Sequence, residues 1–340
     1  MPEAQIETDI VIVGAGPVGL FAVFEAGMLQ MRCHLIDALE MNGGQCAALY
    51  PEKPIYDIPG YARIDARGLV RVLEEQAAPF EPVYHLSQQV TKLTPAPRER
   101  WRLETSAGTR IDAKAVVIAA GGGSFGPNRP PLPGIASYEG KSVFYYVKRP
   151  EDFRGKRLVI AGGGDSAVDW SLILADVAAR IAVVHRRAKF RAVPESAAKL
   201  QALAEADKID LVIPYQLAGL EGADGRLEAV IVKTLKGEAK RLEADALLAF
   251  YGLAMKLGPI AEWGLELERN QIAVDPATCA TNRAGIFAIG DIATYPGKLK
   301  LILTGFSEAA MAAHAIYKRV YPERELHFEY STIKGVPGRD

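Results

Sequence analysis

One pattern occurs twice in this chain and limits its fold more than any other feature: a short apolar run, a glycine-rich turn and a helical periodicity. The first turn begins at Gly14 and the second at Gly162, and the next strand-like run ends 23 residues further on in both copies, at Asp37 and His185. Strand, tight turn, helix and strand in this order open a βαβ unit. The repeat therefore predicts two nucleotide-binding units in one chain.

The first copy has the residues that a dinucleotide-binding turn requires. Gly14, Gly16 and Gly19 suit the tight turn, the close approach of a pyrophosphate and the packing of helix against strand. Val18 lies on the same turn, and the free N–H groups of the helix that follows favour phosphate. Asp37 stands where an acid usually binds ribose hydroxyls; the alternative is a solvated acid at a strand end.

The second copy differs where its second strand ends. The position of the acid holds His185, Arg186 and Arg187, with Arg191 about one helical turn further on. A carboxylate would repel a 2′-phosphate, whereas arginine binds one bidentately and stays charged. The pattern favours NADPH here and a dinucleotide without that phosphate, such as FAD, at the first turn; the alternative is a basic surface cluster. The expected contacts on the second turn are Gly162, Gly164, Asp165 and Ser166.

Length and composition agree with two ordinary globular domains. The chain has 340 residues, is 49% hydrophobic and has a net charge of −1, so no overall field attracts nucleic acid or a membrane. The beginning of the chain does not resemble a signal peptide, and no apolar run approaches the ~20 residues of a membrane helix. We therefore expect a cytoplasmic protein that binds neither nucleic acid nor membrane.

The alternation of strand-like and helical segments predicts an α/β fold with parallel sheets. A stretch rich in Gly and Pro, residues 121–134, marks the first crossing between domains, and a second crossing is expected near residues 251–259. The run from Gly285 to Asp291 looks like a strand of the first domain. We expect a discontinuous FAD-binding domain of residues 1–121 and 253–340, which includes a C-terminal extension (323–340), around an NADPH-binding domain of residues 122–252.

Two further segments carry a family resemblance. Gly285–Asp291 (GIFAIGD) resembles the "GD" segment of flavoprotein reductases with two dinucleotide-binding domains, and residues 117–121 (VIAAG) look like their "ATG" strand. The length and spacing are similar to those of small, dimeric thioredoxin reductases. The resemblance implies a thioredoxin-reductase-like fold with two Rossmann-like domains, one for FAD and one for NADPH.

The cysteines argue against a disulfide reductase. Residues 145–148, which match the family's CxxC, contain no cysteine, and Cys46 has no partner close in sequence. A thiol–disulfide relay needs an attacking and a resolving sulfur, which a single cysteine cannot supply. We interpret Cys46 as a small buried residue. The other two cysteines, Cys33 and Cys279, form no CxxC either, and the five histidines are too dispersed to predict a metal site.

Segments 43–46, 50–53 and 57–60, together with the C-terminal extension, resemble ferredoxin–NADP reductases of the thioredoxin-reductase-like type. The resemblance implies a homodimer in which FAD takes a hydride from NADPH at N5 and exchanges single electrons with ferredoxin or flavodoxin. It implies that Tyr50 stacks on the isoalloxazine and that Tyr330, or else Phe328, covers its other face; the alternative is that these are ordinary tyrosines. The implied FAD contacts are Asp37, Gln45, Tyr50, Val90, Phe125, Asp291 and Thr332.

Other expectations and alternatives follow from this comparison. We expect a helix that begins near residues 304–306 to direct its N-terminus at the flavin. A basic rim facing an acidic ferredoxin has three candidate residues, unless these are merely solvated: Lys298, Lys300 and Lys334. Three other functions stay open: a disulfide reductase with an unrecognised cysteine arrangement, an NAD(P)H oxidase or quinone reductase, and a non-catalytic flavin-binding protein. The complete second turn argues against the last.

Overall fold

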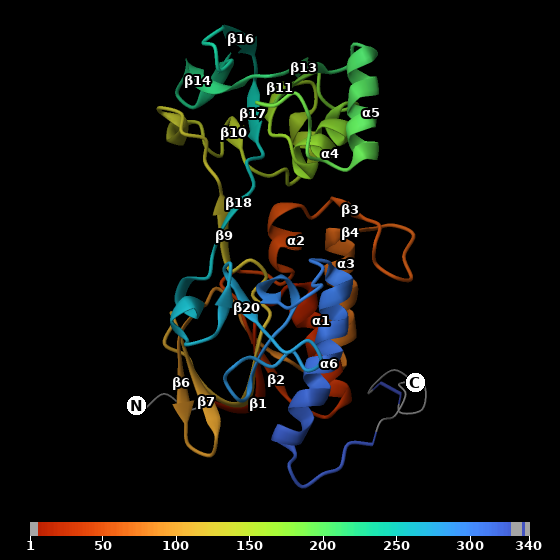
Figure 1. The fold of residues 1–340 in the computed structure, drawn as a ribbon, viewed down its shortest axis with the longest axis vertical. Helices are drawn as coiled ribbons and strands as arrows, with labels where there is room; N and C mark the ends of the chain where they lie inside the picture. Colours follow the sequence, from red (N-terminus) through yellow and green to blue (C-terminus); the bar gives the residue numbers. More distant parts are fainter. Residues whose placement is uncertain (1–5, 328–334, 337–340) are drawn as a thin grey trace. The chain divides into compact units, whose positions relative to one another are not determined.

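The computed structural model describes residues 6–327 and 335–336, apart from the side chains of residues 124–125 and 253–255. The chain divides into two compact units (Figure 1). Unit 1 consists of Met1–Phe125 and Met255–Asp340, and unit 2 of Gly126–Ala254. The two crossings contain β9 (Ser124–Pro127) and β18 (Leu253–Lys256), which pair with each other.

Within the described residues, unit 1 is built on a seven-stranded sheet with the order β5-β2-β1-β8-β7-β6, in which β21 also pairs with β8. The pairs β1–β2, β1–β8, β2–β5 and β8–β21 are parallel, whereas β6, β7 and β8 are antiparallel. The strands are β1 (Ile6–Val13), β2 (Cys33–Ile36), β5 (Val83–His85), β6 (Val90–Ala96), β7 (Arg100–Thr105), β8 (Arg110–Ile118) and β21 (Ile286–Ala288).

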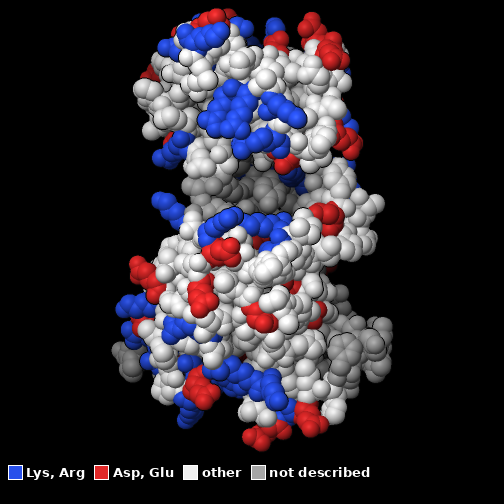
Figure 2. All heavy atoms as spheres, in the orientation of Figure 1, with Lys and Arg blue, Asp and Glu red and all other residues white. Residues whose placement is uncertain are grey.

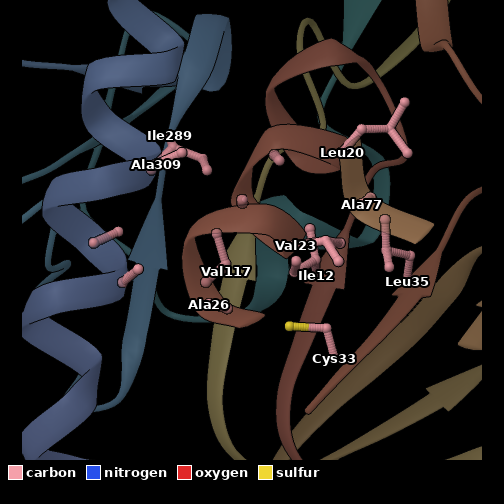
Figure 3. Close-up of a cluster of buried hydrophobic side chains, with 14 of the residues drawn as sticks. Ile12, Leu20, Val23, Ala26, Cys33, Leu35, Ala77, Val117, Ile289 and Ala309 are labelled. Carbon is pink, nitrogen blue, oxygen red and sulfur yellow. The ribbon is translucent and has the colours of Figure 1, made fainter. Parts of the chain in front are cut away.

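Two cores lie on the two faces of this sheet. The last six residues of β1 are all buried, as expected of a parallel strand covered on both sides. One core packs the sheet against α1 (Pro17–Met28), α3 (Ala66–Ala77) and α6 (Ile302–Val320), and Figure 3 shows Ile12, Val23 and Ala309 within it. The second core contains Trp101 and Trp263. Unit 1 also contains α2 (Gly44–Leu49), the strands β3 (Pro54–Ile55), β4 (Ile64–Asp65), β19 (Leu267–Glu268), β20 (Gln271–Ala273) and β22 (Ala293–Thr294), and 3₁₀ turns at Ala78–Phe80, Gly258–Glu262 and Gly290–Ile292.

Unit 2 contains a five-stranded parallel sheet with the order β10-β17-β11-β12-β13 among the residues that the structure describes. The three strands that follow β13 in the sequence form an antiparallel sheet with the order β14-β15-β16. The elements are β10 (Val143–Phe144), β11 (Arg157–Ala161), α4 (Asp165–Leu174), β12 (Arg180–Val184), α5 (Pro194–Glu205), β13 (Asp210–Val212), β14 (Gln216–Ala223), β15 (Arg226–Lys233), β16 (Ala239–Glu243) and β17 (Ala246–Ala249), with 3₁₀ turns at Ile135–Ser137 and Pro150–Phe153.

The first helix of unit 2 is shorter than the periodicity predicts. The helical periodicity of residues 167–179 predicts a helix up to Ala179, but α4 ends at Leu174. The backbone beyond it pairs with the preceding turn instead, because Gly155 N donates to Val177 O at 3.0 Å and Ala179 N donates to Lys156 O at 2.9 Å. These bonds fix the approach to β12, and a continued helix would lose them.

Candidate cofactor sites

The first glycine turn leaves no room for side chains. A Cβ on Gly14, whose φ is +112°, would lie 2.4 Å from Ala119 O, and one on Gly19 would lie 2.0 Å from Gly14 O. Both neighbours are backbone atoms, so they cannot rotate away. Helix α1 begins at Pro17 without a side-chain cap, and its first N–H groups are therefore available to an anion.

Asp37 is fixed at the end of β2 rather than freely solvated. Its Oδ2 accepts from Ala15 N at 2.7 Å and its Oδ1 accepts from Leu39 N at 2.9 Å. Burial raises the pKa of Asp37, and the N–H groups of Leu39, Ala15 and Ala38 oppose that rise. The carboxylate is thus anchored to the glycine turn and retains lone pairs that can accept hydroxyl donors.

A cavity of about 290 Å³ in unit 1 brings most of the predicted FAD contacts together. It is framed by the first glycine turn, the end of β2, α2, the segment Gly290–Asp291 and the start of α6. Gly19 does not line the cavity. The side chain of Phe125 is not described, and four predicted residues lie outside the described part of the chain: Phe328, Tyr330, Thr332 and Lys334. The predicted residues that line the cavity are Gly14, Gly16, Val18, Asp37, Gln45, Tyr50, Val90 and Asp291.

The sequence did not point to several residues that line this cavity. Helix α6 begins at Ile302, two residues before the predicted start, and Leu301 and Ile302 face the cavity. Trp263 also lines it, and its buried Nε1–H has no hydrogen-bond partner among the described residues. An unsatisfied buried donor calls for an acceptor, which a bound dinucleotide would offer.

The segment Gly290–Asp291 is tied to its surroundings on both sides. Gly290 N donates to Glu308 Oε2 at 2.7 Å, and Gln271 Nε2 donates to Asp291 O at 2.9 Å. The side chain of Val18 occupies the space beside Gly305, where a Cβ would lie 2.4 Å from it. The glycine turn, this segment and α6 therefore form one packed assembly around the cavity.

The predicted place of Lys298 on a basic rim is wrong. Its side chain is only 4% exposed and forms an ion pair with Glu308, whose side chain is 1% exposed. A carboxylate buried in α6 requires a nearby cation, and Lys298 is drawn inward to supply it. Lys300 is exposed and stays a candidate.

The second glycine turn is backed by a histidine ring. A Cβ on Gly163 would lie 2.0 Å from His185 Cε1, and Arg191 N donates to Gly163 O at 2.7 Å. The expected helical turn before Arg191 is wrong, because residues 186–193 form a loop that this hydrogen bond folds back onto the glycine turn. Asp165 Oδ1 accepts from Val193 N at 2.8 Å and so joins the start of α4 to the same loop.

The basic residues after β12 occupy two different environments. His185 is 6% exposed, stacks on Phe190 with ring centroids 5.2 Å apart, and has no partner for its Nε2 among the described residues. Arg186, Arg187 and Arg191 are exposed, and no described carboxylate pairs with them. Figure 2 shows basic side chains grouped on the visible face of unit 2. The arginines are thus free to bind an anion, whereas His185 supports their loop from behind.

The burial of His185 predicts a pH-dependent contribution to stability. Burial lowers the pKa of His185, and Arg191, Arg187 and Arg186 lower it further. The unfolded chain therefore takes up this proton first, and the contribution is present above about pH 6.5 and is lost as the pH falls. We expect His185→Phe to lose less stability than the unaltered protein between pH 8 and pH 5.5 in urea unfolding. An identical loss would contradict this, and His327→Phe, at an exposed site, is the control.

A mostly parallel core of strands in each unit, with a glycine turn before the first helix, defines a protein with two dinucleotide-binding folds. Residues 8–315 match the family described as pyridine nucleotide-disulphide oxidoreductase, and the chain belongs to that family. The predicted two-Rossmann, thioredoxin-reductase-like fold class is confirmed by the thioredoxin reductase of Lactococcus lactis. Its structure has a TM-score of 0.78 and 26% sequence identity and covers 93% of this chain and 99% of its own.

Two curated relatives are much more similar in sequence. A ferredoxin–NADP reductase of Paramagnetospirillum magneticum is 63% identical over 98% of this chain and 99% of its own length. A ferredoxin–NADP reductase of Granulibacter bethesdensis is also 63% identical, over 98% of this chain and 95% of its own. The resemblance noted in the sequence is thereby confirmed.

Proposed function

We propose that this chain is an FAD-dependent enzyme that exchanges electrons between NADPH and ferredoxin, as a ferredoxin–NADP reductase. The observation that carries the proposal is the 63% identity, over nearly the whole chain, to relatives with that name. The geometry supports it independently, because two glycine turns lead to opposite charges: Asp37 in unit 1 and the arginines after β12 in unit 2.

FAD fits the cavity of unit 1. The glycine turn and the start of α1 would hold its pyrophosphate, Asp37 would accept from its ribose hydroxyls, and Asp291 would meet the ribityl region. Tyr50 would stack on the ring system; its hydroxyl already hydrogen-bonds with Cys46, and burial raises its pKa. When bound, the flavin converts the two-electron chemistry of NADPH into the one-electron chemistry of ferredoxin.

Unit 2 would bind NADPH. The turn at Gly162 and Gly164, with Ser166 at the start of α4, would receive the pyrophosphate. The exposed guanidinium groups of Arg186, Arg187 and Arg191 would bind the 2′-phosphate. The domain assignment of the sequence, with FAD in the discontinuous part of the chain and NADPH in the inserted part, is retained in this proposal.

The partner and the setting belong to the same proposal. Ferredoxin or flavodoxin would be the electron carrier, and the protein would work as a cytoplasmic homodimer in which Tyr330 and Thr332 of the extension contact FAD. In the described part of the chain, no helix combines the length and the apolar character needed to cross a bilayer. The names of the relatives support the ferredoxin assignment, and the family resemblance supports the dimer.

Disulfide reduction is the activity of the structurally similar thioredoxin reductase, and the cysteines argue against it here. Cys33, Cys46 and Cys279 are all unpaired and buried. Burial raises the pKa of the Cys46 thiol to about 11 and that of Cys279 to about 12. Since the thiolate is the attacking species, neither thiol is prepared for exchange.

Rapid-mixing kinetics test the proposed function directly. The FAD-loaded protein is reduced with NADPH or NADH and then reoxidised by ferredoxin, flavodoxin, a quinone, oxygen or an aromatic disulfide in parallel. We expect NADPH to exceed NADH and ferredoxin or flavodoxin to exceed all the other acceptors. Reoxidation by a quinone or oxygen as fast as by ferredoxin would overturn the assignment of the acceptor.

A further inference from the structure

Glu308 in α6 is a buried carboxylate whose partners all come from one short segment of chain. Its Oε2 accepts from Gly290 N at 2.7 Å, and its Oε1 accepts from Tyr295 OH at 2.7 Å and from Lys298 Nζ. The side chain is 1% exposed, so water does not solvate it. A carboxylate in such a place is tolerated only when it is fully hydrogen-bonded and neutralised, which these three donors achieve.

The segment that Glu308 holds forms two walls of the FAD cavity. Its first end, Gly290–Asp291, lines the cavity directly. Its other end leads through Lys298 into Leu301 and Ile302 at the start of α6, which line the same cavity. Glu308 itself does not line the cavity. It therefore reaches the cavity only through the backbone that it fixes.

We propose that Glu308 is a positioning residue for FAD. By accepting the Gly290 N–H it sets the direction in which Asp291 faces the cavity, and through Lys298 it sets where α6 begins. The Gly290 bond is the essential one, because it is the contact next to a predicted FAD contact. The inference relies on the proposed function only for the presence of FAD in unit 1.

Two double variants separate this role from simple stabilisation. Glu308→Gln with Lys298→Met and Glu308→Leu with Lys298→Met both remove the buried ion pair without leaving an uncompensated charge. The first keeps an oxygen that can accept from Gly290 N, and the second does not. We expect the Gln variant to keep FAD affinity within about threefold and the Leu variant to lose about tenfold or more, as for a lost hydrogen bond to a buried donor.

The holoenzyme gives three measurements: the FAD dissociation constant from flavin fluorescence, the flavin midpoint potential and the melting temperature. We expect a shifted potential in the Leu variant only. Ser307→Ala, an exposed neighbour on the same helix, is the matched control and should leave all three unchanged. Equal FAD affinity and equal potential in the two double variants would overturn the proposal.

A third variant covers the case in which the Leu variant does not fold. Glu308→Asp keeps the charge opposite Lys298 but withdraws the acceptor from Gly290 by one methylene. We expect weaker FAD binding than in the Gln double variant, and binding as tight as in the unaltered protein would overturn the proposal. If the unaltered protein itself bound no FAD, the proposed function would fail instead, so the two failures are distinguishable.

Discussion

Replacing Arg186 and Arg187 together with glutamine should weaken NADPH binding at least a hundredfold and change NADH binding less than threefold. Each arginine is exposed and, within the described chain, has no carboxylate partner, so its charge is available to a phosphate. A hydrogen bond to a charged group contributes about 1.5–3 kcal/mol, and two such bonds account for a change of this size. NADH lacks the 2′-phosphate, so its affinity does not depend on these two arginines.

Flavin reduction measured over a range of NADPH and NADH concentrations gives both dissociation constants. Arg180→Gln is the matched control, because Arg180 belongs to the same unit and pairs with Asp210 on an exposed surface. A parallel loss of NADPH and NADH affinity in the double variant would mean that the arginines support the fold of the loop rather than the choice of nucleotide. His185, which already supports that loop, makes this outcome unexpected.

The Gly19→Ala substitution should yield a protein that purifies with little or no FAD. The new methyl group would lie 2.0 Å from Gly14 O, a backbone atom within the turn itself. Relief requires α1 to move away from β1, which displaces the N–H groups that would bind the pyrophosphate. Overpacking of this kind also costs about 1–3 kcal/mol of folding free energy.

The ratio of flavin to protein absorbance after purification, together with the melting temperature, measures both effects. Gly126→Ala is the control, because no heavy atom lies within 4 Å of the position of its Cβ. A Gly19→Ala protein with a full complement of FAD would show that the turn has more freedom than its backbone contacts allow.

The sequence predicts the parts of the site that are local in the chain. The glycine turn, Asp37 and the arginines after β12 lie within two spans of some two dozen residues, where spacing alone relates them. The residues that it misses depend on contacts between distant segments. In the sequence Lys298 looks like a surface lysine. In the structure it is buried, because it forms an ion pair with Glu308 in α6.

The sequence does not indicate the antiparallel pairing of β6, β7 and β8 in unit 1, for a related reason. The order of apolar and polar residues indicates strands but not which neighbours they join, and β6 to β8 pair within a sheet that is otherwise parallel. Trp263 is likewise brought to the cavity by the return of the chain to unit 1, far from either glycine turn in sequence. No local pattern marks either feature.

The insertion of unit 2 into unit 1 imposes an order on folding during synthesis. Unit 2 is formed by one uninterrupted segment of chain, so it can fold as soon as β17 has left the ribosome. Unit 1 cannot, because β21 and α6, which contribute to its sheet and its helical core, follow unit 2 in the sequence. At a translation rate of about 5–20 residues per second, roughly 10–30 s pass between the synthesis of β8 and that of its partner β21. During that interval an apolar edge of β8 is exposed and can pair with other chains. In the cell, chaperones or fast translation would have to protect it.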